Sequence, residues 1–123
     1  MKYLCLAYEE EKKLNDLSSS EWDALRRETL AYVDDLTKRG CLIAAEALQR
    51  ARTATTVRVR DGRISLTDGP FAESKEQLGG FFLIDAPDMN AAIRVASNWP
   101  SARLGSIEVR PIEEELAQDR RYH

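Results

Sequence analysis

Short runs of apolar residues, separated by polar and glycine-containing turns, divide this chain of 123 residues into strands and helices. Runs that alternate with a period of two, or that have no polar interruption, predict strands. Apolar positions that repeat every three to four residues predict amphipathic helices. The polar segment that follows the first strand predicts a loop. We expect strands at 2–8, 41–49, 55–60, 63–67, 79–86 and 105–112.

Two helices are expected between these strands. Ser18 and Glu21 have the spacing of a capping box, in which the serine accepts an early helix N–H and the glutamate reaches back to the N-cap N–H. A helical stripe of apolar residues then runs to Gly40, which takes the left-handed conformation that ends a helix without penalty. The second helix is expected over 88–98, with Asp88 as its N-cap.

The order of these elements predicts an α+β, ferredoxin-like fold. Asp61-Gly62 is a strong two-residue turn signal, so strands 55–60 and 63–67 form an inserted β-hairpin. Without this hairpin the order is βαβ followed by βαβ. Right-handed crossovers place both helices on one face of the sheet. The other face stays bare and apolar, and we expect a second copy to cover it in a homodimer. Residues 1–112 are expected to form one domain and 113–123 a charged tail.

Composition narrows the classes of function. The formal net charge of -3 gives no basic footprint for nucleic acid, and the arginines between 50 and 63 are interpreted as solvated hairpin residues. The chain shows neither the long apolar core of a signal peptide nor a membrane span, so we expect a cytoplasmic protein. Cys5 and Cys41 lack metal-ligand spacing and are expected to be reduced, buried and too far apart to pair. No metal and no cofactor are therefore expected.

Glu46 is the first candidate for chemistry, because it lies in an otherwise apolar strand. A carboxylate among apolar neighbours has a perturbed pKa unless it is paired. The alternative is a structural ion pair with Arg58 or Arg110. Glu108 and Arg110 lie two residues apart on the last strand and therefore share a face. Arg110 could capture a carboxylate of the protein or of a ligand.

The segment around Asp68 supplies the remaining candidates. Asp68 precedes Gly69-Pro70, where its carboxylate could accept N–H groups of the turn or act as an acid or base. Phe71 is expected to anchor the loop 68–78 against the end of the sheet, the alternative being stacking on a ligand. Tyr8 could hydrogen-bond within a cleft or simply pack at the strand end. Gly79-Gly80 indicates a bulge or a close backbone approach.

Residues 68–76, DGPFAESKE, nearly reproduce the signature that names the DGPFAETKE group of the YCII-related (YciI-like) family, with Ser74 in place of Thr. Segments 1–8, 45–48, 54–62 and 105–111 also resemble family positions. The resemblance implies a dimeric α/β barrel, and its members are often encoded beside extracytoplasmic-function sigma factors. It also implies a His–Asp pair as an active site. Here the only histidine is His123, at the end of the tail, so a paired imidazole inside the fold is not expected.

Two functions remain open at this point. The first is a small-molecule-binding or regulatory dimer linked to sigma-factor signalling. The second is a minor enzyme that uses carboxylate acid/base chemistry, with Asp68 or Glu46, in a cleft near the DGPF loop. A cavity with convergent ionisable groups favours ligand chemistry, whereas a packed barrel favours a structural role. The ligand candidates common to both functions are Tyr8, Glu46, Asp68, Phe71, Glu108 and Arg110.

Overall fold

A computed structural model describes residues 1–122 of the chain. Its centre is a four-stranded sheet in the order β2-β5-β1-β6, in which every neighbouring pair is antiparallel. The first strand thus lies between the third and fourth strands of the two βαβ units, as the ferredoxin-like prediction requires. The elements of this layer and of the helices that cover it are β1 (Lys2–Glu9), α2 (Ser19–Lys38), β2 (Leu42–Ala47), β5 (Gln77–Asp85), α3 (Met89–Ser97) and β6 (Gly105–Pro111).

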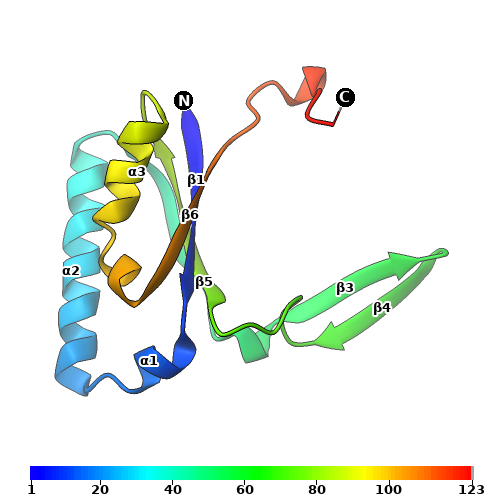
Figure 1. Cartoon of the computed structure of the whole chain (residues 1–123), viewed down its shortest axis with the longest axis horizontal. Helices are drawn as coiled ribbons and strands as arrows, with labels where there is room; N and C mark the ends of the chain where they lie inside the picture. The colour runs from blue at the N-terminus through cyan, green and yellow to red at the C-terminus, as the bar shows by residue number, and fades with distance from the viewer. Residues whose placement is uncertain (123) are drawn as a thin grey trace.

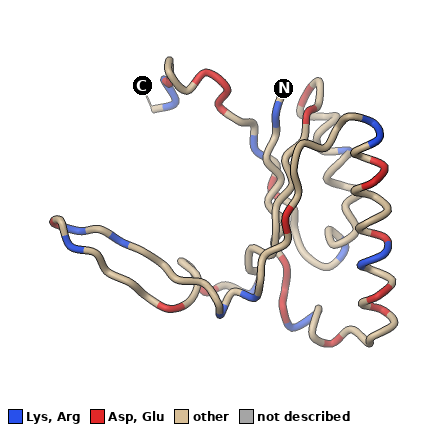
Figure 2. Tube along the Cα trace, turned by 180° about the vertical axis from the view of Figure 1, so that it is seen from behind, with Lys and Arg blue, Asp and Glu red and all other residues tan. Residues whose placement is uncertain are grey.

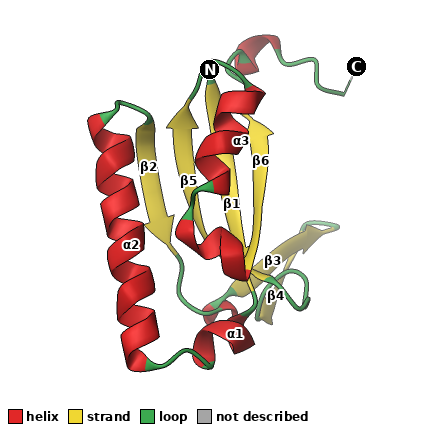
Figure 3. Cartoon of the chain, turned by 60° about the vertical axis from the view of Figure 1, so that its left-hand side comes forward, coloured by secondary structure: helices red, strands yellow, loops and turns green. Residues whose placement is uncertain are grey.

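Helices α2 and α3 lie on the same face of the sheet (Figures 1 and 3). The capping box of α2 is present, since Ser18 Oγ accepts from the Glu21 N–H at 3.2 Å and Glu21 Oε1 accepts from the Ser18 N–H at 2.9 Å. Gly40 follows this helix with φ of 71°, in the left-handed region. Asp88 caps α3 by accepting the Ala91 N–H at 2.8 Å. Both predicted helices are confirmed.

The polar segment after β1 was predicted as a loop, and this was wrong. It contains a short helix, α1 (Glu11–Asn15). Hydrogen bonds to residues that are distant in the sequence stabilise this helix. Glu11 Oε1 accepts the Ala51 N–H at 2.8 Å, and Asn15 Oδ1 accepts from Arg50 Nη2 at 2.5 Å. Ala51 begins the 3-10 turn η1 (Ala51–Thr53). A helix this short is unstable by itself and depends on tertiary contacts. The local pattern of residues does not reveal those contacts.

The core lies between the sheet and the two helices. Tyr3, Cys5, Phe82 and Ile84 point toward the helices and are at most 2% exposed. The Phe82 ring stacks on Trp99, with centroids 4.0 Å apart and ring planes 10° apart. Trp99 precedes the 3-10 turn η2 (Pro100–Leu104). Alternate residues of the strands therefore fill one well-packed apolar layer.

The hairpin forms a separate two-stranded sheet of β3 (Thr55–Arg60) and β4 (Arg63–Asp68). Asp61 and Gly62 have φ of 51° and 75°, which fits a type I′ turn and confirms the predicted hairpin. Figure 1 shows that it projects from the side of the central sheet opposite the helices. Cross-strand pairing places four apolar side chains on one face of the hairpin. They are 56–72% exposed and comprise Val57, Val59, Ile64 and Leu66.

After β6 the chain continues on the open side of the sheet, away from the helices (Figure 1). The Ile112 N–H donates to the Lys2 carbonyl at 3.0 Å, and the Lys2 N–H donates to Glu114 Oε1 at 2.8 Å. The last element of the chain is the 3-10 turn η3 (Leu116–Gln118). His123, the only histidine, lies outside the described residues. Of the helices described, none has the length and apolar character needed to cross a membrane.

Candidate functional site

The face of the sheet opposite the helices is uncovered and apolar at its centre. Leu4, Leu6, Phe81 and Leu83 occupy the alternate positions of β1 and β5 and are only partly buried. Figure 2 shows that the strands consist mostly of uncharged residues, whereas α2 carries charges of both signs along its length. We call this surface the open face. It is the bare apolar face that the order of elements predicted.

Three of the predicted ligand residues lie together on one side of the open face. In the pairing of β1 with β6, Leu6 is opposite Glu108 and Leu4 is opposite Arg110. Tyr8 continues the same row of β1. The guanidinium of Arg110 donates to the Glu108 carboxylate. The structure therefore gives Arg110 a protein carboxylate as its partner, at the border of an apolar surface.

Glu46 lies at the opposite border of the same face. Glu46, Phe81, Leu6 and Glu108 are successive register partners across the four strands. At about 4.8 Å per strand, Glu46 and Glu108 are about 14 Å apart. Within residues 1–122 Glu46 pairs with no cation, and it is exposed, so the predicted ion pair and the predicted burial of this carboxylate are both wrong for a single chain. Arg58, its other expected partner, lies over the Phe71 ring in the loop that follows β4 instead.

Asp68 and Phe71 lie away from the open face, at the base of the hairpin. The Gly69 N–H donates to the Ala54 carbonyl at 2.7 Å, and Thr56 Oγ1 donates to the Gly69 carbonyl at 2.9 Å. These bonds close the turn. Among the described residues no N–H donates to the Asp68 carboxylate, which is exposed, so its predicted role in the turn is not found.

Phe71 does not anchor the loop against the sheet. Its side chain is 79% exposed and its ring contacts the guanidinium of Arg58, 5.5 Å from the ring centroid. The predicted burial of Phe71 is therefore wrong in one chain. The rest of the DGPF segment holds the loop in place through polar contacts. Ser74 Oγ donates to the Glu76 carbonyl at 2.6 Å, and Glu76 Oε1 accepts from Ser106 Oγ of β6 at 2.7 Å.

Glu9, at the end of β1, is a functional candidate that the sequence reasoning missed. Its carboxylate is half-buried and lies directly over Gly79, where an added Cβ would be 2.1 Å from Glu9 Cδ. Burial raises the pKa of Glu9 above its ordinary value, and the negative charge of Glu11 raises it further. Two signals were available in the sequence. Glu9 continues the period-two series of buried residues in β1, and Gly79-Gly80 indicated a close approach.

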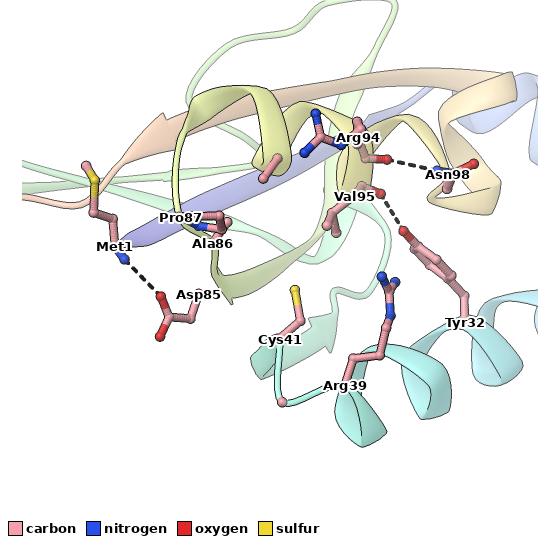
Figure 4. A pocket seen from close by; sticks show the side chains of 12 residues that line it. Met1, Tyr32, Arg39, Cys41, Asp85, Ala86, Pro87, Arg94, Val95 and Asn98 are labelled. Atoms are coloured by element: carbon pink, nitrogen blue, oxygen red, sulfur yellow. Dashed lines mark hydrogen bonds and ion pairs between the residues drawn. The ribbon is translucent and has the colours of Figure 1, made fainter.

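A polar cleft of about 670 Å³ lies between the C-terminal end of α2 and α3 (Figure 4). The Tyr32 hydroxyl donates across it to the Val95 carbonyl at 2.8 Å. Cys41 lines this cleft and is only partly buried, which corrects the prediction that both thiols are buried. Burial raises the pKa of the Cys41 thiol, while the positive charge of Arg39 acts in the opposite direction. Both cysteines are free, as predicted.

Comparisons with known proteins agree with the geometry. The YCII-related domain matches residues 1–115. The chain belongs to the YCII-related family. A relative of this chain is the "Uncharacterized protein R00369" of Rhizobium meliloti (strain 1021). The two sequences are 35% identical over 114 residues, which cover 91% of this chain and 92% of the relative.

A solved structure with a similar fold is the 5-chloro-2-hydroxyhydroquinone dehydrochlorinase TftG of Burkholderia phenoliruptrix AC1100, in complex with 2,5-dihydroxybenzoquinone. The TM-score is 0.55 at 16% identity, with 97% of this chain and 100% of TftG covered. At this identity the likeness concerns the fold. The YCII-related chain and TftG thus have a similar α+β fold. Across residues 1–122 no group of three His, Cys, Asp or Glu side chains could hold a metal ion.

Proposed function

We propose that this YCII-related protein is a homodimeric α/β-barrel protein that binds a small molecule between two facing sheets. The observation that carries the proposal is the open face, an apolar centre bordered by the Arg110–Glu108 pair and by Tyr8. A contiguous exposed apolar surface of this kind typically marks a site of interaction with a partner or a ligand. Polar groups at its border then provide orientation for a ligand, as in most small-molecule sites.

The arrangement of the chain around the open face supports a second copy as its cover. The hairpin and the segment after β6 both extend beyond the sheet on that side (Figure 1). The exposed apolar face of the hairpin, with Val57 and Ile64, offers a second surface for the same partner. Together they favour an extensive interface, on the order of 2,000 Å² or more, as in obligate dimers.

A ligand between the sheets is supported by Arg110 and by the fold relationship. Arg presents a planar fork that binds carboxylates in two parallel hydrogen bonds, so an anionic ligand could compete with Glu108 for it. TftG, which has a similar fold, is described in complex with a small quinone. This favours a small organic ligand over a macromolecule.

Carboxylate acid/base chemistry near the DGPF loop is a weaker proposal. Asp68 is exposed, and no second ionisable group among the described residues is hydrogen-bonded to it. A general acid or base needs an environment that tunes its pKa toward neutrality. The regulatory role linked to sigma-factor signalling remains a prediction from the family resemblance.

Light scattering tests the dimer. The wild-type protein at micromolar concentration is expected at twice the 13.9 kDa mass of one chain. Leu6→Asp puts a charge at the centre of the open face and is expected to give a folded monomer, because burying an unpaired carboxylate is costly. Glu73→Gln, a change at an exposed loop position, serves as the control that stays dimeric. A wild-type monomer would overturn the barrel proposal.

A thermal-shift screen against small anionic metabolites tests the ligand. A compound that binds only the folded state raises the melting temperature. Its affinity is expected to fall at least about tenfold in Arg110→Ala, a loss of about 1.4 kcal/mol. Asp68→Asn is the matched variant outside the proposed site and is expected to keep the affinity. An affinity that falls in Asp68→Asn but not in Arg110→Ala would move the site to the DGPF loop.

A further inference from the structure

A further cavity lies on the helix side of the sheet, opposite the open face, between α2 and the β2–β5–β1 part of the sheet. Its volume is about 440 Å³, within the range of small-molecule sites. Its walls are mostly apolar and aromatic, and α1 contributes at one end. Trp22, on α2, lines the cavity although its side chain is 46% exposed, so it is an aromatic surface that the fold leaves open. The other principal wall residues are Leu14, Leu25, Ala47, Phe82 and Trp99.

The Glu9 carboxylate is a charged group without a partner on the helix side of this wall, whereas Glu46, which also lines the cavity, is the register partner of Phe81 on the open face. Within residues 1–122 Glu9 accepts no hydrogen bond from the protein and pairs with no cation. Two of the charged residues nearby have partners within the chain. Arg26 pairs with Asp23 at 3.4 Å, and Glu11 accepts the Ala51 N–H at 2.8 Å. A half-buried carboxylate without a donor is costly unless something offsets its charge.

Gly79 gives this carboxylate its position, and Gly80 allows a close approach of the β2 backbone. A Cβ at Gly79 would lie 2.1 Å from Glu9 Oε1, and a Cβ at Gly80 would lie 2.9 Å from the Glu46 carbonyl oxygen. Any side chain at Gly79 would push the carboxylate away from the sheet. Gly79 thus does more than permit a bulge, because it makes room for an acidic group beside an apolar cavity.

We propose that this cavity binds a small arylalkylamine, with its ammonium group on the Glu9 carboxylate and its ring against Trp22 and the apolar wall. The cation supplies the charge that Glu9 lacks, and a protonated amine also gains from aromatic faces nearby. The flat ring buries apolar surface that the fold leaves accessible. This site faces the helices, so it is separate from the open face and does not depend on a dimer.

Isothermal titration calorimetry with tryptamine tests the proposal. Indole-3-propionate is the matched probe, since it keeps the indole ring and a short chain but replaces the amine with a carboxylate. Tryptamine is expected to bind at least about tenfold more tightly than the acid. Glu9→Gln, which is nearly isosteric, is expected to weaken tryptamine binding at least about tenfold, whereas Glu73→Gln keeps it unchanged. Equal binding of the two probes, no binding of tryptamine, or full affinity in Glu9→Gln would overturn the proposal.

A measurement on the wild-type protein locates the site without relying on any variant. Amide resonances of Gly79 and Gly80 are expected to shift on addition of tryptamine, because both residues line the cavity. Shifts restricted to the residues around Arg110 would place the probe on the open face and contradict the assignment. Since Leu6→Asp leaves the Glu9 cavity intact, tryptamine is expected to bind this variant as well. Loss of the dimer and loss of this site can therefore be distinguished.

Discussion

The two faces of the central sheet come from the same strands and carry similar apolar side chains, yet they end in different environments. Cys5 and Phe82, on the covered face, are 0% exposed. Leu6 and Phe81, their sequence neighbours on the open face, are only partly buried. The difference arises because α2 and α3 lie on one face (Figure 3). A continuous apolar strand thus indicates two buried faces, and the tertiary structure shows which of them one chain covers by itself.

The largest effect is expected from the pair Phe82→Ala and Phe81→Ala, measured by urea unfolding in the Leu6→Asp background, which is expected to be monomeric. Phe82→Ala removes a fully buried ring that stacks on Trp99 and is expected to cost about 3–5 kcal/mol. Phe81→Ala removes a partly exposed ring and is expected to cost about 1 kcal/mol. Equal costs in the monomer would show that the open face is packed within one chain.

An effect of intermediate size is expected in the reactivity of the two cysteines, of which Cys5 lies on the covered face. Burial raises the pKa of Cys5 from 9.0 to about 12, with a smaller contribution from Cys41. At pH 8 this leaves on the order of a thousandfold less thiolate than in an ordinary thiol. Cys41, at the cleft, is expected to react with a thiol reagent in the native state, and Cys5 only after unfolding. Rapid native reaction of both thiols would contradict the packing of the covered face.

The raised pKa of Cys5 also predicts how the stability of the fold changes at alkaline pH. Above about pH 9 the Cys5 thiol ionises in the unfolded chain but stays protonated in the folded chain. The unfolded state then binds fewer protons, so this contribution to stability is fully present below pH 9 and is lost as the pH rises toward 12. Cys5→Ala is expected to lack this pH dependence.

The smallest effect is expected for Phe71→Ala. This ring is 79% exposed, so in the Leu6→Asp monomer the free energy of unfolding should change by less than about 0.5 kcal/mol. The measurement is a urea titration alongside the parent variant. A clearly larger loss would show that the DGPF loop packs on the sheet, as its sequence suggested. In the wild-type protein, a larger cost than in the Leu6→Asp variant would place Phe71 in the proposed dimer interface.

Local signals in the sequence determined most of the architecture. The capping box of Ser18, the N-cap Asp88 and the Asp61-Gly62 turn each act within a few residues, so their effects can be predicted without a fold. Alternation in the last strand also placed Glu108 and Arg110 on one face, and the register of β6 with β1 adds Tyr8 to it. Glu9 belongs to the alternating series of β1 as well. Its importance could be recognised only once the face covered by the helices was known.

Only the tertiary structure decided which candidates meet. Glu46 and Glu108 share a face but lie on outer strands, because the order β2-β5-β1-β6 separates them by two strands. Phe71 has the composition of an anchor but lies at the base of a projecting hairpin, where the single chain offers no surface to cover it. Glu9 became a candidate because Gly79, seventy positions later, lies beside it. Local patterns fix the direction of a side chain, whereas its surroundings depend on contacts between distant segments.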